Sequence, residues 1–304
     1  MNGSAVRGAK TVEAEVRLEL REELSSYEDL NDLHLLKSAT SMDRANLRRR
    51  PFFFRGDGRQ LALDDLYSGQ SVFVICNGPS CTPSLRQALQ RAGVLTFGIN
   101  NGAFSFHPNL WACVDAPHRF VECIWKDPAI LKFSPFANLR GRLWDSRQNK
   151  YSSTTAADCP NVAWFLRNER FCASSWLTER TFNWGNHSDL GGGRSVLLPA
   201  LKICCLLGFA NIFLVGCDMH MEAKRPYWFA ERRNKVMVAN NAHTYACLQG
   251  YLDELEPHLR AGRHRVFNLN PESALRVFPF IALDEALERA AIPRFGTTAG
   301  MYSR

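Results

Sequence analysis

Short apolar runs that end abruptly in polar turn residues dominate the sequence from residue 71 onward. Val72-Phe73-Val74-Ile75-Cys76 stops at Asn77-Gly78-Pro79-Ser80, and Asn211–Val215 stops at Gly216-Cys217-Asp218. Runs of this length that are apolar at every position are typical of strands buried on both faces of a sheet. A chain that alternates such strands with helices is expected to form a parallel sheet with a helix layer on each face.

Helical stretches lie between these apolar runs. Ser84–Ala92 ends at Gly93, and Ser195–Leu207 ends at Gly208, as expected where a helix stops in a left-handed residue. Further strands are predicted at Val94–Ile99, Trp111–Val114 and Arg265–Leu269, and further helices at His243–Leu259 and Leu283–Ala290. We therefore predict an α/β fold with an open, mostly parallel, Rossmann-like sheet and right-handed crossovers. The region Ile124–Trp184 has no clear periodicity, and no elements are assigned to it.

The first 60 residues differ in composition from the rest of the chain. They are highly charged, with a predicted helix through Val12–Leu24 and the run Arg48-Arg49-Arg50 before Pro51. We predict a helical N-terminal extension over residues 1–60. Residues 61–304 are then one Rossmann-like domain that binds a nucleotide sugar, with a lid at about 219–242.

Composition bears on location and partners. The ten cysteines form no CxxC pair, and several lie in apolar runs where a thiol behaves as a small hydrophobic group, which indicates a reducing compartment. No run of eighteen apolar residues occurs, so we expect no membrane span and a cytoplasmic protein of a bacterium or of a phage-infected host. The net charge of +7 favours a polyanionic partner such as nucleic acid.

Polar residues follow each predicted strand at its carboxyl end, where parallel α/β sheets bind their ligands. Turn formation by itself explains any one of these loops, but the convergence of five loops on one edge favours a binding site. The candidate ligand-binding residues are Asn77, Gly78, Ser80, Asn100, Asn101, Asp115, Asp218, Asn268, Asn270 and Ser273.

Neither of two common phosphate-binding motifs follows the first strand. The loop has no GxxxxGK[ST] lysine, and the absence of GxGxxG disfavours a dinucleotide-dependent dehydrogenase. The better phosphate candidate is Gly191-Gly192-Gly193-Arg194-Ser195, where Gly193 allows close approach of the backbone and Ser195 caps a helix. A glycine turn followed by a capped helix is an equally good interpretation of this segment.

The order of these motifs resembles that of bacterial sialyltransferases of the Campylobacter type. The motifs are a strand followed by Asn77-Gly78-Pro79-Ser80, a strand followed by Asn100, a Gly/Ser segment before an apolar helix, Leu207-Gly208-Phe209, and Gly216-Cys217-Asp218. A late histidine and Asn270-Pro271-Glu272-Ser273 complete the series. The chain is also similar to phage and bacterial homologues of unknown function and to archaeal pterin diphosphokinase-like proteins.

The resemblance implies a glycosyltransferase that uses a nucleotide-sugar donor, CMP- or UDP-linked, without a required metal. It implies donor binding by Asn77, Gly78, Ser80 and Asn100 or Asn101, with Gly193 and Ser195 in the segment before the apolar helix. It further implies that His243 is the general base, a role that suits an imidazole at neutral pH. The residues implied to stabilise the departing phosphate from the lid are Tyr227 and Arg225.

Several alternatives stay open at this level. The net charge, the arginine run and the basic stretch 223–235 slightly favour a hydroxymethylated base in phage DNA as the acceptor. The tryptophans that could receive an extruded base are Trp164, Trp176, Trp184 and Trp228. Asp218, His220 and Glu222 alternate along the chain and could hold a divalent ion. A magnesium-dependent diphosphokinase acting on a pterin-like alcohol is a second enzyme class. A non-catalytic nucleic-acid-binding module is the third possibility.

Overall fold

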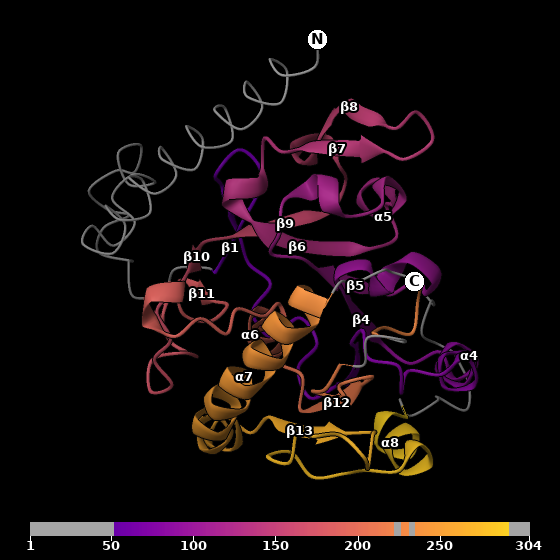
Figure 1. Cartoon of the computed structure of the whole chain (residues 1–304), viewed down its shortest axis with the longest axis vertical. Helices are drawn as coiled ribbons and strands as arrows, with labels where there is room; N and C mark the ends of the chain where they lie inside the picture. The colour runs from indigo at the N-terminus through magenta and orange to yellow at the C-terminus, as the bar shows by residue number, and fades with distance from the viewer. Residues whose placement is uncertain (1–51, 222–225, 231–234, 292–304) are drawn as a thin grey trace, which may run out of the picture.

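A central, mostly parallel sheet organises the molecule (Figure 1). The computed structural model describes residues 52–221, 226–230 and 235–291, and within them one sheet has nine strands in the order β13-β12-β3-β4-β5-β6-β9-β1-β2. The seven strands from β13 to β9 pair in parallel, whereas β1 and β2 add an antiparallel edge. The strands are β1 (Phe53–Phe54), β2 (Gln60–Leu61), β3 (Ser71–Ile75), β4 (Thr96–Ile99), β5 (Leu110–Ala112), β6 (Leu131–Pro135), β9 (Val162–Phe165), β12 (Asn211–Val215) and β13 (Arg265–Asn268).

Smaller elements surround this sheet. Two short strand pairs are β7 (Arg142–Asp145) with β8 (Lys150–Thr155), and β10 (Arg167–Asn168) with β11 (Phe182–Asn183). The helices are α4 (Pro83–Ala92), α5 (Glu122–Lys126), α6 (Leu197–Leu206), α7 (Lys235–Ala261) and α8 (Leu283–Ala290). Short 3-10 turns are η2 (Asn100–Ser105), η3 (Pro117–Arg119), η4 (Phe136–Asn138), η5 (Ala156–Asp158) and η6 (Ser188–Leu190).

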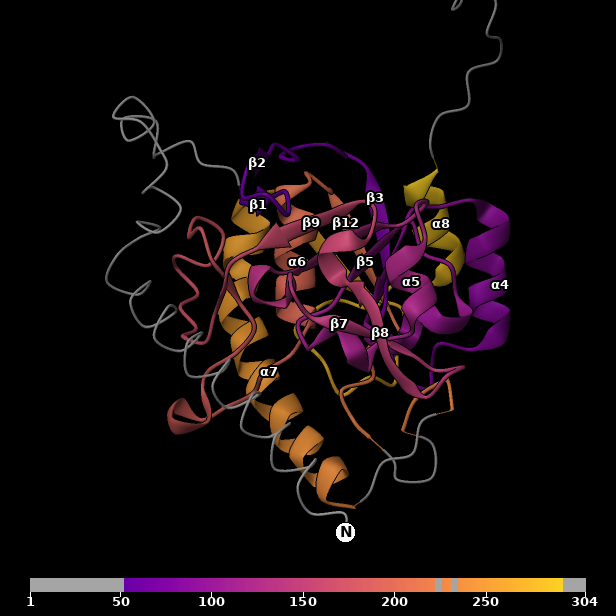
Figure 2. The same ribbon diagram turned by 90° about the horizontal axis from the view of Figure 1, so that it is seen from above.

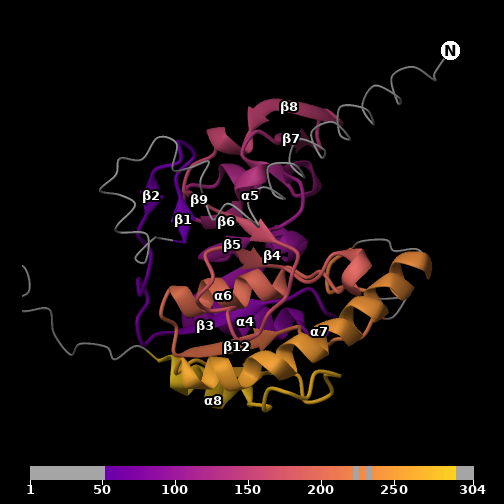
Figure 3. The same cartoon turned by 90° about the vertical axis from the view of Figure 1, so that its left-hand side faces the viewer.

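Helices cover both faces of the sheet, as the alternating pattern predicted (Figures 2 and 3). On one face, Leu89 of α4 and Ala286 of α8 pack in one cluster with Phe73 of β3 and Phe213 of β12. On the other face, α6 and α7 pack against the same strands, and nine of the ten α6 residues are buried. The predicted α/β sheet with helix layers on both faces is confirmed.

Local signals account for the element boundaries near the first strand. The side chain of Thr82 accepts a hydrogen bond from Leu85 N at 3.2 Å, and Pro83 occupies the first helical position of α4. Gly93 ends the helix with φ of 65°, a conformation that glycine adopts without a Cβ penalty. The chain then enters β4, so β3, α4 and β4 form the predicted βαβ unit.

Three boundaries differ from the sequence-based expectations. Helix α7 begins at Lys235, eight residues before the predicted start at His243, so the predicted lid at 219–242 contains the first two turns of this helix. Phe53–Phe54, within the predicted helical extension, form β1 and join the sheet. Residues 1–51 of that extension, including the Val12–Leu24 helix, lie outside the described residues, and Gln60 at its end begins β2. Strands β6 and β9, in the unassigned region, complete the centre of the sheet.

A topological switch point lies between β3 and β12. From β3 the chain proceeds through β4, β5 and β6 to β9 in one direction, and it then returns to place β12 on the other side of β3. The loops that leave β3 and β12 therefore diverge to opposite faces at neighbouring carboxyl ends. Crevices of this kind are where open α/β sheets bind ligands.

Two further observations concern cysteines and membranes. All ten cysteines lie in the described part of the chain, and none of them forms a disulfide. Over the same residues, no helix combines the length and the apolarity that a membrane crossing requires.

Candidate functional site

Asp218 is the centre of the polar contacts at the switch point. It follows β12, and its carboxylate accepts hydrogen bonds from Ser80 N at 3.0 Å and from the Ser80 hydroxyl. The carboxylate also accepts a hydrogen bond from Asn270 Nδ2 at 2.8 Å, and the residue is only 3% exposed. One carboxylate thus joins the loops that follow β3, β12 and β13.

Gly78 is required by the closeness of these loops. Its N–H donates to Gly216 O at 2.8 Å. A Cβ at this position would lie 2.5 Å from the Asp218 carboxylate and 2.5 Å from Gly216 O, which is too close for any side chain. The glycine of the Asn-Gly-Pro-Ser loop therefore serves the packing between strand ends.

Asn268 and Ser273 lie beneath the edge of the sheet. The Asn268 side chain donates to Cys217 O at 3.1 Å, and the Ser273 hydroxyl donates to the same oxygen at 2.6 Å. Both residues are almost fully buried. The structure thus places them in contact with the main chain after β12, where they position Asp218.

Three asparagines at the ends of β3 and β4 each bury an acceptor that has no partner. The side-chain oxygens of Asn77, Asn100 and Asn101 receive no hydrogen bond from any described residue. A Cβ on Gly102 would lie 2.6 Å from Asn77 Oδ1, so these two loops are in contact. An unsatisfied buried acceptor costs about 1–3 kcal/mol, and native proteins place few of them without a purpose.

Residues 226–230 of the predicted lid lie against the end of β3. The Trp228 indole donates to Cys76 O at 3.0 Å, and Trp228 N donates to Asn77 O at 3.2 Å. The Arg86 guanidinium lies 4.0 Å from the centre of the Trp228 ring. The Tyr227 ring stacks on Phe229, with a centroid separation of 5.2 Å. Arg225 lies outside the described residues.

Tyr245 of α7 belongs to the same edge. Burial raises the pKa of its phenol, and the neighbouring Tyr227, Cys217, Cys76 and Asp218 raise this pKa further. These neighbours lie directly after β3 and β12 and in the 226–230 segment. The phenol therefore stays protonated at neutral pH and can act only as a neutral hydrogen-bonding group.

His243 faces the glycine loop from within α7. Its Nε2 lies 3.0 Å from Gly191 O, and a carbonyl can only accept, so Nε2 carries the proton. In the neutral imidazole the lone pair then lies on Nδ1, which is the atom able to accept a further proton. Cys247, one turn later, lies with Sγ 3.6 Å from Nε2 and donates to Gly191 O at 3.5 Å.

Backbone conformation accounts for the three glycines before α6, and a close contact with α7 accounts further for one of them. Gly191, Gly192 and Gly193 all have positive φ. A Cβ on Gly193 would lie 2.4 Å from Cys247 Cβ. Ser195 Oγ accepts from Leu197 N at 3.2 Å at the start of α6. The structure thus favours the turn-and-cap interpretation of the segment, because positive φ accounts for its three glycines and packing against α7 accounts further for Gly193.

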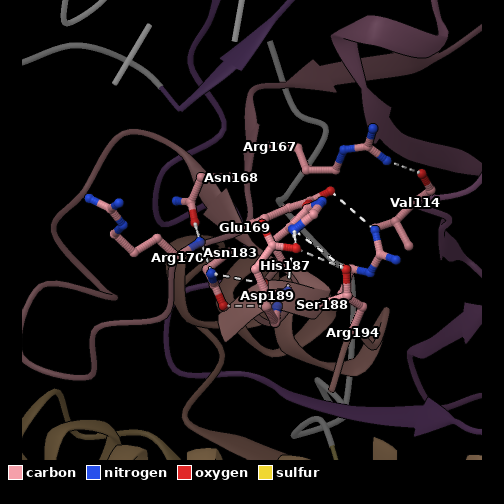
Figure 4. A network of polar contacts seen from close by, with 11 residues as sticks. Val114, Arg167, Asn168, Glu169, Arg170, Asn183, His187, Ser188, Asp189 and Arg194 are labelled. Carbon is pink, nitrogen blue, oxygen red and sulfur yellow. Dashed lines mark hydrogen bonds and ion pairs between the residues drawn. The ribbon is translucent and has the colours of Figure 1, made fainter. Parts of the chain in front are cut away.

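A second polar cluster lies farther along the carboxyl edge, beyond β5 (Figure 4). The predicted residue Asp115 follows β5, where its carboxylate lies 3.6 Å from Arg119 Nη1. Arg167, which follows β9, donates from Nη1 to Val114 O at 2.8 Å. The distance from Arg194 Nη1 to Glu169 Oε1 is 3.3 Å. Arg167 and Glu169 were not among the predicted site residues, although both follow the short apolar run Val162–Phe165.

The alternative metal site is only partly described. His220 Nδ1 lies 3.1 Å from Asp218 O and donates to that carbonyl, because the oxygen can only accept. Glu222 lies outside the described residues. Among the residues that are described, no three His, Cys, Asp or Glu side chains are arranged to hold a metal ion.

Two of the tryptophans considered as base receivers belong to the core. Trp164 and Trp176 are at most 2% exposed, so neither ring is available to a base. Trp228 covers the end of β3 as described above, and Trp184 belongs to the cluster near β9.

Comparisons with known proteins give no relative. No family model matches the chain, no curated protein matches it, and no solved structure matches it. The functional assignment therefore depends on the geometry of the site and on the motif resemblance.

Proposed function

We propose that this protein is a glycosyltransferase that binds a nucleotide-sugar donor at the switch point between β3 and β12. The observation that carries the proposal is the set of unpaired buried oxygens on Asn77, Asn100 and Asn101 at the ends of β3 and β4. These acceptors call for donors from outside the described chain. The ribose hydroxyls and the exocyclic amino group of a nucleoside are donors of the required kind.

The neighbouring contacts support a rigid binding site. Asp218 connects Ser80 with Asn270, and the buried Asn268 holds the loop after β12. A site with its loops already connected loses little conformational freedom when a ligand binds. The motif resemblance supplies the donor class, a CMP- or UDP-linked sugar.

The proposed catalytic step uses His243 as general base. Nε2 is held by Gly191 O, so Nδ1 is the atom that takes the proton from the acceptor hydroxyl. The hydroxyl oxygen bonds to the anomeric carbon while the bond from that carbon to the phosphate oxygen breaks, and the nucleotide leaves with the electron pair. Helix α7 has 27 residues and is about 40 Å long at 1.5 Å per residue. It is therefore longer than a five-residue strand of the sheet. His243 is the ninth residue of α7 and so lies in its third turn.

A thermal-shift panel tests the proposal. The ligands are CMP, UDP, GDP, ATP and the corresponding nucleotide sugars, each with magnesium and with EDTA, because a ligand that binds only the native state raises Tm. We expect one pyrimidine nucleotide and its sugar conjugate to raise Tm equally in magnesium and in EDTA, and we expect Asn77→Ala to reduce this shift. A shift with ATP and magnesium alone would contradict the proposal and favour the diphosphokinase. The absence of any shift would contradict both enzyme assignments.

A further inference from the structure

The cluster at the carboxyl end of β9 contains a cation without a direct anionic partner. Arg167 donates one hydrogen bond, to the carbonyl of Val114, and no carboxylate among the described residues lies within 4.0 Å of its guanidinium. The side chain is only partly exposed. A guanidinium carries five N–H donors, so most of its hydrogen-bonding capacity is unused by these contacts.

The nearby carboxylates are each held by another cation. Glu169 Oε1 lies 3.3 Å from Arg194 Nη1, and Glu169 Oε2 lies 3.9 Å from His187 Nε2. Asp115 lies 3.6 Å from Arg119. Burial lowers the pKa of the Arg167 guanidinium. The negative charges of Glu169 and Asp115 raise this pKa, and the positive charge of Arg194 lowers it. The positive charge of Arg167 is therefore compensated only from a distance.

Trp184 gathers two arginines and has an unused donor of its own. The guanidinium carbon of Arg167 lies 4.6 Å from the ring centroid, and that of Arg194 lies 5.0 Å from it. The Trp184 indole nitrogen is buried and donates to no described residue, and the side chain is only 9% exposed. Two cations and an unpaired N–H thus meet at one ring, and of the two cations only Arg194 pairs directly with a carboxylate, that of Glu169.

We infer that Arg167, Arg194 and Trp184 form a binding site for an oxyanion, the phosphate or carboxylate group of a second ligand. A guanidinium forms paired hydrogen bonds with the oxygens of a planar carboxylate and with those of a tetrahedral phosphate. This site is distinct from the switch point, because β9 lies four strands from β3, roughly 19 Å at about 4.8 Å per strand.

The position of the site identifies its ligand as the acceptor, and this step rests on the proposed function. The two sites share the carboxyl edge and are connected through Arg119, whose carbonyl accepts from Asn101 Nδ2 at 3.3 Å and whose guanidinium faces Asp115. If the donor binds at the switch point, the site at the carboxyl end of β9 remains available for the acceptor. The acceptor class is therefore a hydroxyl compound that carries a phosphate or carboxylate group.

Isothermal titration with inorganic phosphate and with malonate tests the anion site, with sodium chloride holding the ionic strength constant. We expect the wild type to bind one of the two, phosphate for a phosphorylated ligand or malonate for a carboxylated one. We expect at least tenfold weaker binding in Arg167→Gln and in Arg194→Gln. The matched control Arg91→Gln changes an exposed arginine at the end of α4, far from this edge, and is expected to bind as the wild type does.

Two arms keep the result decisive. The Arg194 side chain is 42% exposed, so Arg194→Gln is expected to fold. If Arg167→Gln does not fold, the anion binding of Arg194→Gln alone tests the inference. Asn77→Ala should retain anion binding, and Arg194→Gln should retain the nucleotide shift, so failure of one site is distinguishable from failure of the other. Wild-type protein that binds neither anion, or binding that is unchanged in both arginine variants, would overturn the inference.

Discussion

The carboxylate of Asp218 accepts hydrogen bonds from both the backbone N–H and the side-chain hydroxyl of Ser80, a residue 138 positions earlier in the chain. The contact joins the two strand ends on either side of the switch point. It also fixes the orientation of the loop that carries Asn77 and Gly78. The same carboxylate reaches Asn270, so a single buried group connects three parallel strands.

Asp218→Asn is expected to destabilise the fold. The replacement turns one of two acceptor oxygens into an NH2 group, which then faces the donors of Ser80 or Asn270, and an unmet buried donor costs about 1–3 kcal/mol. Urea unfolding measures the change, with Asp253→Asn on the exposed face of α7 as the control. Equal unfolding free energies for the two variants would show that the Asp218 contacts do not stabilise the protein.

Gly193→Ala is expected to cost more stability than Gly191→Ala. Both glycines have positive φ, so both variants pay about 1–2 kcal/mol for a left-handed alanine. At Gly193 the new methyl would also lie 2.4 Å from Cys247 Cβ, whereas nothing lies within 4 Å at Gly191. Crowding of this kind adds about 1–3 kcal/mol. Thermal and urea unfolding of the pair would isolate this packing contribution, and identical values would contradict the contact.

Lys202 makes stability depend on pH. Its side chain is fully buried in α6 and donates to the carbonyls of Glu179 and Thr181 at 2.8 and 2.9 Å. Burial lowers the pKa of Lys202 to about 7, from an ordinary value of 10.5. Between these two values the unfolded chain binds a proton that the folded chain does not, so stability rises with pH, by up to about 1.4 kcal/mol per pH unit.

Lys202→Met removes this dependence. From pH 7 to 8.5 the wild type should gain about 2 kcal/mol relative to the variant, since the titration of the cysteines in the unfolded chain is common to both proteins. Lys126→Met, at an exposed position of α5, should retain the wild-type slope. Parallel curves of unfolding free energy against pH for wild type and Lys202→Met would exclude Lys202 as the cause.

His243→Ala separates catalysis from binding. Under the proposed function the variant should lose transfer activity, because it lacks the imidazole that accepts the proton of the acceptor hydroxyl. The nucleotide thermal shift should stay as in the wild type. Asn77→Ala should instead weaken the nucleotide shift. Radiolabelled sugar transfer and thermal shift on both variants check this, and undiminished turnover in His243→Ala would remove the histidine from the mechanism.

Strong local patterns made much of the fold predictable. The predicted strand Asn211–Val215 matches β12, and the predicted helix Leu283–Ala290 matches α8. Each segment has the hydrophobic periodicity of a single type of secondary structure and clear ends. β6 was missed because Lys132 and Ser134 interrupt its apolar pattern although both are buried. The start of α7 was missed because the motif resemblance placed residues 219–242 in a lid.

The residues at the carboxyl edge were predictable as a group, because parallel strands bring their ends together and each strand ends in polar residues. Their individual roles were not. Whether Asn268 faces a ligand or the main chain depends on its partner Cys217, 51 residues away. The convergence of Arg167 and Arg194 on Trp184 depends in the same way on where β9, β11 and the glycine loop meet. Local sequence thus determined which segments became strands and helices, through periodicity and turn chemistry. Only the tertiary structure decided which polar groups were satisfied and which stayed unpaired, because hydrogen bonds and charge pairs form between segments distant in the chain.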